Sequence, residues 1–331
     1  MILKEVKQNG MEILAVTFVL IALMSVSMFL PLTARFISVP ANGTPLFNTI
    51  YNLLFGGNVS IGTQVISLFF LFVEVFLVVV MNNKFELTRA KSTMFVLIYM
   101  VLALSYIPIS TFLPEQIANI FVILGFYKIL SSHGKDDATF HFFDGGFFFG
   151  LAALFCLPAT VLLIIGLLAY VIFRPYPFRE FAVYIIGFLT PMFFYVSLYY
   201  IFEDTLQPLA DYYVQKFSVG LNFKVTHNEL ICFGTHLLLV LIASVIISQE
   251  YPKYNLFESR TYRLFFILFL LILIITLTPF FGIQTFKMLL MPVTMLYVTV
   301  FFNMKQGLFS EIFFAIFILS NIGMQILWYM M

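Results

Sequence analysis

The stretch IGTQVISLFFLFVEVFLVVVM at residues 61–81 determines the class of this chain. It is long enough to cross a bilayer as one helix, it is apolar on every side, and Glu74 is its only charged residue. Similar runs recur along the chain, and none alternates with the two-residue period of a barrel strand. The sequence therefore predicts an all-α integral membrane protein with about eleven transmembrane helices, at 11–31, 61–81, 92–110, 113–130, 143–157, 159–173, 181–202, 228–248, 263–281, 285–302 and 307–330.

The composition supports this class. Of 331 residues, 62% are hydrophobic and 10% are charged, whereas soluble domains are about half apolar and about a quarter charged. One globular core would not hide so large an apolar excess, so lipid is the expected solvent and membrane lipids are the expected partners. The formal net charge of +1 gives no indication of nucleic acid as a partner.

The orientation follows from the basic residues. The run at 143–173 is long for one helix and short for two, and Pro158 lies in its middle. It crosses either once, as a kinked helix, or twice, and the charge distribution favours two crossings. With a cytoplasmic N-terminus and a periplasmic C-terminus, two crossings leave four of the 17 Lys and Arg residues outside: Arg35, Lys216, Lys224 and Lys287.

Two outer loops are long enough to carry structure of their own. Residues 46–54, in the loop at 32–60, have the pattern of a short helix in the membrane interface. Its expected apolar face is formed by Leu46, Phe47, Ile50, Leu53 and Leu54. The loop at 202–227 has a similar pattern, with Leu206, Leu209, Tyr213 and Phe217 on one face. The alternative is that both loops only cover helix ends.

Motifs for catalysis or for cofactors do not occur. The sequence has no phosphate-binding Gly-rich loop, no HExxH, no CxxC and no GxSxG. Cys156 and Cys232 lie in apolar runs and are expected to pack inertly. We therefore expect no metal site and no cofactor.

Polar residues inside the predicted spans are the first candidate site residues. Glu74 is expected to face the bundle interior, because a carboxylate at membrane depth is costly unless it is paired or protonated. It is either a proton or substrate site or a link between two helices. His236 lies in a predicted span and is either functional or satisfied by a neighbouring helix.

Charged residues at the membrane surfaces are the second group of candidates. Glu115 follows Pro114 at a helix start, where it is either a site residue or a favourable charge at a helix N-terminus. Asp204 and Asp211 lie in the second outer loop and are either bases or cation ligands, or solvated surface acids without such a role. Candidate residues for binding a lipid phosphate are Arg35, Arg174 and Arg179.

A resemblance covers residues 11–202. The segment FDGGFFFGLAAL at 143–154, followed by Pro158 and the turn RPYPFRE at 174–180, resembles the middle of the superfamily C glycosyltransferases (GT-C). The chain is also similar to a multi-pass inner-membrane family of Bacteroidetes that has the same PLFN loop, here at 45–48. The resemblance implies a GT-C-like membrane module at 1–202, followed by C-terminal transmembrane helices at 203–331.

One departure from the GT-C pattern shapes the functional hypothesis. Enzymes of that superfamily carry a catalytic acid in the first outer loop, but residues 32–60 contain no Asp or Glu. Glu115 matches the place of a second acid. We therefore expect a non-catalytic scaffold or subunit of an envelope-assembly complex in the bacterial inner membrane, with other membrane or envelope proteins as partners. The alternative is a glycosyltransferase that uses a polyprenyl-phosphate sugar, with Glu115, Asp204 or Asp211 as its base, and a transporter ranks third.

Overall fold

The computed structural model describes residues 44–56, 61–88, 92–106, 112–173, 178–218, 227–250, 254–276, 288, 290–304 and 307–330. Within these residues the chain is all-helical, with no strand, as the sequence predicts. The helices are α3 (Pro45–Phe55), α4 (Ile61–Phe85), α5 (Ser92–Tyr106), α6 (Pro114–Leu130), α7 (Thr139–Phe155), the 3-10 turn η2 (Leu157–Val161), α8 (Leu162–Phe173), α9 (Phe178–Glu203), α10 (Gln207–Ser218), α11 (His227–Glu250), α12 (Leu256–Thr276), α13 (Leu290–Asn303) and α14 (Leu308–Met330).

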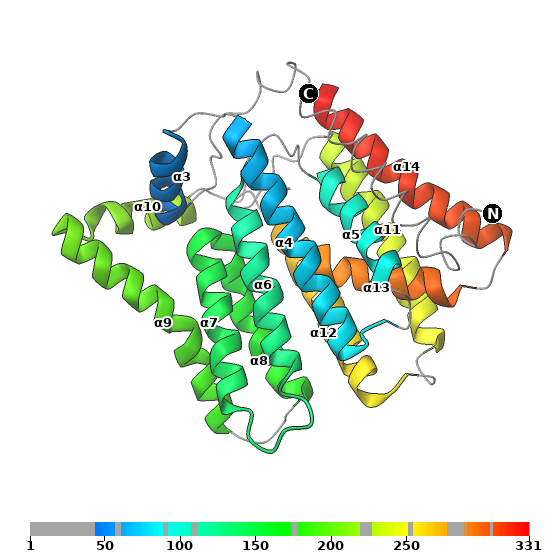
Figure 1. Ribbon diagram of the computed structural model, residues 1–331, viewed down its shortest axis with the longest axis horizontal. Coiled ribbons are helices and arrows are strands. Elements are labelled where there is room, and N and C mark those ends of the chain that lie inside the picture. The colour runs from blue at the N-terminus through cyan, green and yellow to red at the C-terminus, as the bar shows by residue number, and fades with distance from the viewer. Residues whose placement is uncertain are drawn as a thin grey trace.

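Ten of the predicted apolar runs coincide with helices from α4 onward (Figure 1). The predicted run at 11–31 lies outside the described residues. The segment at 143–173 forms two helices, α7 and α8, joined at Pro158 in η2. The Ala138 N–H, at the start of α7, donates to Glu180 Oε1 at the start of α9 (3.1 Å). Because α9 begins beside the start of α7, α8 must run back along α7, as the two-crossing interpretation requires.

Glycines bring α7 and α9 into backbone contact. A Cβ added at Gly146 would overlap with the Tyr184 carbonyl oxygen, and one at Gly150 would overlap with the Phe188 carbonyl oxygen. In the reverse direction, a Cβ at Gly187 would overlap with the carbonyl oxygen of Phe143. The G-x-x-x-G spacing of α7 therefore serves close helix packing, which small residues permit.

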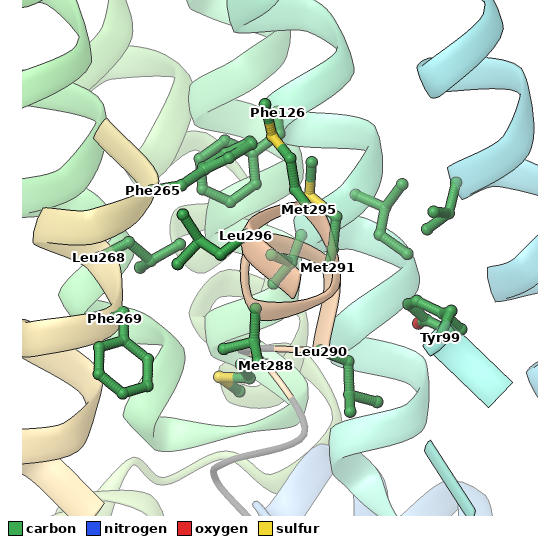
Figure 2. Close-up of a cluster of buried hydrophobic side chains, with 14 of the residues drawn as sticks. Tyr99, Phe126, Phe265, Leu268, Phe269, Met288, Leu290, Met291, Met295 and Leu296 are labelled. Atoms are coloured by element: carbon green, nitrogen blue, oxygen red, sulfur yellow. The ribbon is translucent and has the colours of Figure 1, made fainter. Parts of the chain in front are cut away.

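The centre of the core is formed by α13, which is buried on all sides from Leu290 to Phe301. Figure 2 shows Met291, Met295 and Leu296 of this helix surrounded by side chains from other helices, among them Phe126 of α6 and Phe265 of α12. The rings of Phe126 and Phe265 meet edge to face, with centroids 5.3 Å apart. A helix that is apolar all round is expected at such a central position.

The polar and apolar faces of α4 are arranged in the opposite way to those of a surface helix in a soluble protein. Its buried stripe carries polar Thr63, Ser67 and Glu74 among apolar residues, whereas its exposed stripe is apolar, with Phe69 and Phe72 prominent. A soluble helix turns its polar side chains outward. By length and composition, α4 from Gly62 and α9 are sufficient to cross a membrane.

Both loop helices predicted from the sequence form, as α3 and α10. In α10, Leu209 is buried and Asp211 is exposed, as expected. In α3 the predicted apolar face is divided between the bundle and the exposed side. Phe47 is buried, but its inward neighbour is Tyr51, while Leu53 is 80% exposed. The physical reason is aromatic packing, because Phe47, Tyr51 and Phe55 line up at every fourth residue against Phe112.

Candidate functional site

Glu74 lies in the bundle interior, at the junction of α4, α5 and α6. Its side chain is fully buried, and its Oε2 accepts a hydrogen bond of 2.8 Å from the Tyr99 hydroxyl. The Asn119 amide nitrogen in turn donates to the Tyr99 oxygen at 2.9 Å. The prediction that Glu74 bonds a polar group on another helix is confirmed. We call Glu74, Tyr99 and Asn119 the carboxyl triad.

The direction of these bonds determines what the carboxyl triad can do chemically. The Tyr99 hydroxyl donates its single proton to Glu74 and accepts a hydrogen bond from Asn119, so the two partners together fix its orientation. Glu74 therefore has an oriented hydrogen-bond donor, which stabilises a carboxylate and still permits a protonated carboxyl group. Both readings made from the sequence, a proton site and a link between helices, remain compatible with this geometry.

A second polar contact, between α4 and α6, lies about two turns along α4 from Glu74. Gln116 Nε2 donates to Ser67 Oγ at 2.6 Å, and both side chains are buried. The side-chain carbonyl oxygen of Gln116 (Oε1) accepts a hydrogen bond from the backbone N–H of Leu113, just before α6 (3.1 Å). The Gln116 side chain therefore caps the start of α6 and also forms a hydrogen bond to α4.

Glu115 is buried at the end of the bundle covered by α3. It is 2% exposed, and its carboxyl group lies close enough to the Cys156 thiol to interact with it electrostatically. Its neighbour in sequence, Ile117, packs in one cluster with Phe47 and Tyr51 of α3. The first outer loop and the start of α6 therefore meet, but Glu115 is not open to solvent.

The other two candidate acids lie at the end of α9 and on α10. Asp204 follows the last residue of α9 with a left-handed backbone (φ 52°), and its N–H donates to the Tyr200 carbonyl oxygen at 3.0 Å. This is a helix-ending role that Asp tolerates. Asp211 is exposed on α10. Among the described residues no group of three or more His, Cys, Asp or Glu side chains is arranged to hold a metal ion.

The α10 helix brings tyrosines toward the end of α7. Burial, followed by the influence of Tyr213 and Cys156, raises the pKa of Tyr212 to about 12. The Tyr212 phenol therefore keeps its proton at neutral pH and serves as a hydrogen-bond donor rather than as a base. Nothing in the sequence pattern indicates that Tyr212 approaches Cys156.

The basic candidates are only partly described. Arg35 and Arg174 lie outside the described residues, and so does the His236 side chain, although its backbone is part of α11. Arg179 is described and exposed, with its guanidinium 4.0 Å from Asp137 Oδ2. An exposed pair at that distance contributes little to stability.

Sequence reasoning missed most partners in this site. Tyr99, Asn119, Gln116 and Ser67 were passed over, although each is a polar residue within an apolar run. The available signal was the spacing of Gln116 and Asn119, which places them on one face of α6. Comparisons of the chain with protein-family models, with curated proteins and with solved structures give no match.

Proposed function

We propose that the chain is a multi-pass protein of the bacterial inner membrane. The observation that supports this is the reversed arrangement of α4, whose polar residues are buried while its exposed stripe is apolar. Further apolar side chains are exposed on other helices, including Phe193 of α9 and Ile316 of α14. Such surfaces are stable in lipid tails and unfavourable in water.

The proposed orientation has a cytoplasmic N-terminus and a periplasmic C-terminus. In support of it, the described lysines that the charge pattern assigns to the cytoplasm gather at one end of the bundle. Lys84 contacts Tyr127, and Lys128 contacts Asp144 near the start of α7. We call this end, with Lys135 of the α6–α7 loop, the lysine end; it is the lower end in Figure 1.

Within that membrane we propose a non-catalytic scaffold or subunit of an envelope-assembly complex. This role is supported by the state of the three candidate bases. Glu115 is covered, Asp204 ends a helix, and Asp211 is exposed on a short surface helix. A general base must come within hydrogen-bond reach of an acceptor hydroxyl, and the burial of Glu115 leaves it without such access.

The alternative is a GT-C-type glycosyltransferase that uses a polyprenyl-phosphate sugar. One observation favours it: α3, in the first outer loop, packs against the start of α6 beside Glu115, which is the neighbourhood that the GT-C resemblance implies. In that case Glu115 would act as the base after a movement that uncovers it.

Two experiments separate the proposals. The full chain, purified in mild detergent, is expected to retain partner proteins that mass spectrometry identifies, and to show no turnover with polyprenyl-phosphate sugars and candidate acceptors. Turnover that disappears in Glu115→Gln would contradict the scaffold role and support the glycosyltransferase. Alkaline extraction of membranes tests the membrane location separately, because an integral protein stays in the pellet.

A further inference from the structure

Helix α7 ends just before Pro158, which leaves a backbone carbonyl without its usual donor. In a continuing helix the N–H of residue 158 would donate to the Leu154 carbonyl oxygen, but proline has no N–H. The Cys156 N–H still donates to Ala152, and the Ala159 N–H donates to Cys156, both at 2.9 Å. Because buried backbone groups are nearly always paired, the Leu154 carbonyl requires a donor from another part of the chain.

Thr44, just before α3, supplies that donor. Its buried hydroxyl donates to the Leu154 carbonyl oxygen at 2.5 Å, and the Phe155 carbonyl oxygen lies 3.3 Å from the same hydroxyl. The Thr44 oxygen also accepts the Phe47 N–H at 3.4 Å and so caps the start of α3. One side chain therefore joins the start of α3 to the end of α7.

The rest of α3 packs on the bundle along one side only. Phe47 and Tyr51 are buried in a cluster with Phe112, and the rings of Phe47 and Phe112 have centroids 5.8 Å apart. Leu53 and Leu54 on the other side are exposed. The sequence of α3 contains no charged residue, so no ion pair from this helix adds to its attachment. The Thr44 hydrogen bond therefore acts together with apolar contacts alone or with neutral polar ones.

The place where Thr44 meets α7 adjoins two of the most protected reactive groups of the chain. Cys156 directly follows Phe155, and its side chain is 1% exposed. The Glu115 carboxyl group, which is also buried, lies close enough to act on the Cys156 thiol. In Figure 1, α3 lies at the end of the bundle opposite the lysine end. A displacement of α3 from α7 would therefore take place beside both groups.

We propose that α3 is a lid over Glu115 and Cys156, and that the Thr44 hydroxyl is its latch. When the hydrogen bond to Leu154 breaks, α3 moves off the end of α7 and opens the two groups to solvent. A neutral hydrogen bond shifts an equilibrium only about fivefold in net terms, so the lid can open while the bundle stays folded. In the glycosyltransferase alternative this is the movement that uncovers Glu115, but the lid does not depend on either proposed function.

The rate at which Cys156 reacts with N-ethylmaleimide measures how often the lid is open. The full chain is used in mild detergent with Cys232→Ala, which leaves Cys156 as the only thiol. Thr44→Val removes the hydroxyl, and Thr44→Ser keeps it. The matched control is Thr49→Val, because Thr49 is exposed on the same helix and its hydroxyl donates to the Pro45 carbonyl oxygen (2.9 Å) rather than to α7.

Thr44→Val is expected to raise the labelling rate of Cys156 about five- to tenfold, because the open state gains population when the hydrogen bond is lost. Thr44→Ser and Thr49→Val should stay within about twofold of the unaltered rate. A second reporter separates the lid from general loosening. Ala243 of α11 is fully buried, and Ala243→Cys in a chain without the two native cysteines should react at the same rate with and without Thr44→Val.

Three results would overturn the lid. An unchanged rate at Cys156 in Thr44→Val would show that this hydroxyl does not keep α3 closed. An equal rise at Ala243→Cys would show that the whole bundle loosens. An equal rise in Thr49→Val would assign the effect to the stability of α3 itself rather than to its contact with α7. None of these rates depends on turnover or on partner proteins, so a failure of the lid is distinct from a failure of the proposed function.

Discussion

Gly146 and Gly150 bring the backbone of α7 against α9, whereas α4 meets α5 and α6 through the carboxyl triad and the Gln116–Ser67 bond. In the first interface, glycines lack side chains, so the two helix backbones come into contact. In the second interface, buried polar side chains form hydrogen bonds between the helices. In the proposed membrane location, lipid tails are as apolar as leucine, so neither interface would gain much from apolar burial. The comparison suggests that the first is sensitive to added volume and the second to lost hydrogen-bond partners.

The largest effect is expected from adding volume to the glycine interface. Gly150→Ala places a methyl group on the Phe188 carbonyl oxygen and should lower the free energy of unfolding by about 3 kcal/mol. The matched control is Gly323→Ala in α14, where nothing lies within 4 Å, and it should stabilise the helix by up to about 1 kcal/mol. Thermal unfolding in mild detergent measures both, and equal responses would contradict the close contact.

The next effect concerns the carboxyl group of the triad. Glu74→Leu leaves the Tyr99 hydroxyl without its acceptor, at a cost of about 1–3 kcal/mol, while Asn119 still donates to the Tyr99 oxygen. Glu74→Gln keeps an acceptor oxygen and should cost less. The control Phe72→Leu, on the exposed face of α4, should have little effect. A leucine variant as stable as the glutamine variant would show that the hydrogen bond to Tyr99 does not hold α4.

A smaller effect is expected from the link between α5 and α6. In a double-mutant cycle, Tyr99→Phe and Asn119→Ala should show a coupling energy of about 0.6 kcal/mol, which is typical of polar contacts between membrane helices. Unfolding of the two single variants and of the double variant supplies the cycle. A coupling energy near zero would leave Glu74 as the only partner that matters to Tyr99.

The smallest effect is expected at the surface, away from both interfaces. Asp211 is exposed on α10, so Asp211→Asn should change stability by less than about 0.5 kcal/mol. It should also leave co-purification with partner proteins unchanged, as followed by mass spectrometry. A large loss of stability or of partners would assign Asp211 a role that its exposure does not indicate.

The two interfaces also differ in how far the sequence predicted them. The spacing of Gly146 and Gly150 was visible, but their contact with the backbone of α9 depends on how helices distant in sequence meet. Glu74 was found because a carboxylate stands out in an apolar run, whereas Tyr99 and Asn119 are common enough in such runs to be passed over. In α3 the hydrophobic pattern predicted the helix, whereas the burial of Tyr51 beside Phe112 depends on a residue distant in sequence.

Accessibility labelling tests most directly whether the chain spans a membrane with the lysine end inside. Single cysteines at Asp211 of α10 and at Asp136 of the α6–α7 loop, both exposed, are treated in intact cells with a thiol reagent that does not cross membranes. The unaltered chain, in which Cys156 is buried, gives the background. We expect labelling at Asp211→Cys in intact cells and at Asp136→Cys only after the membrane is opened. Equal labelling of both positions in intact cells would contradict it.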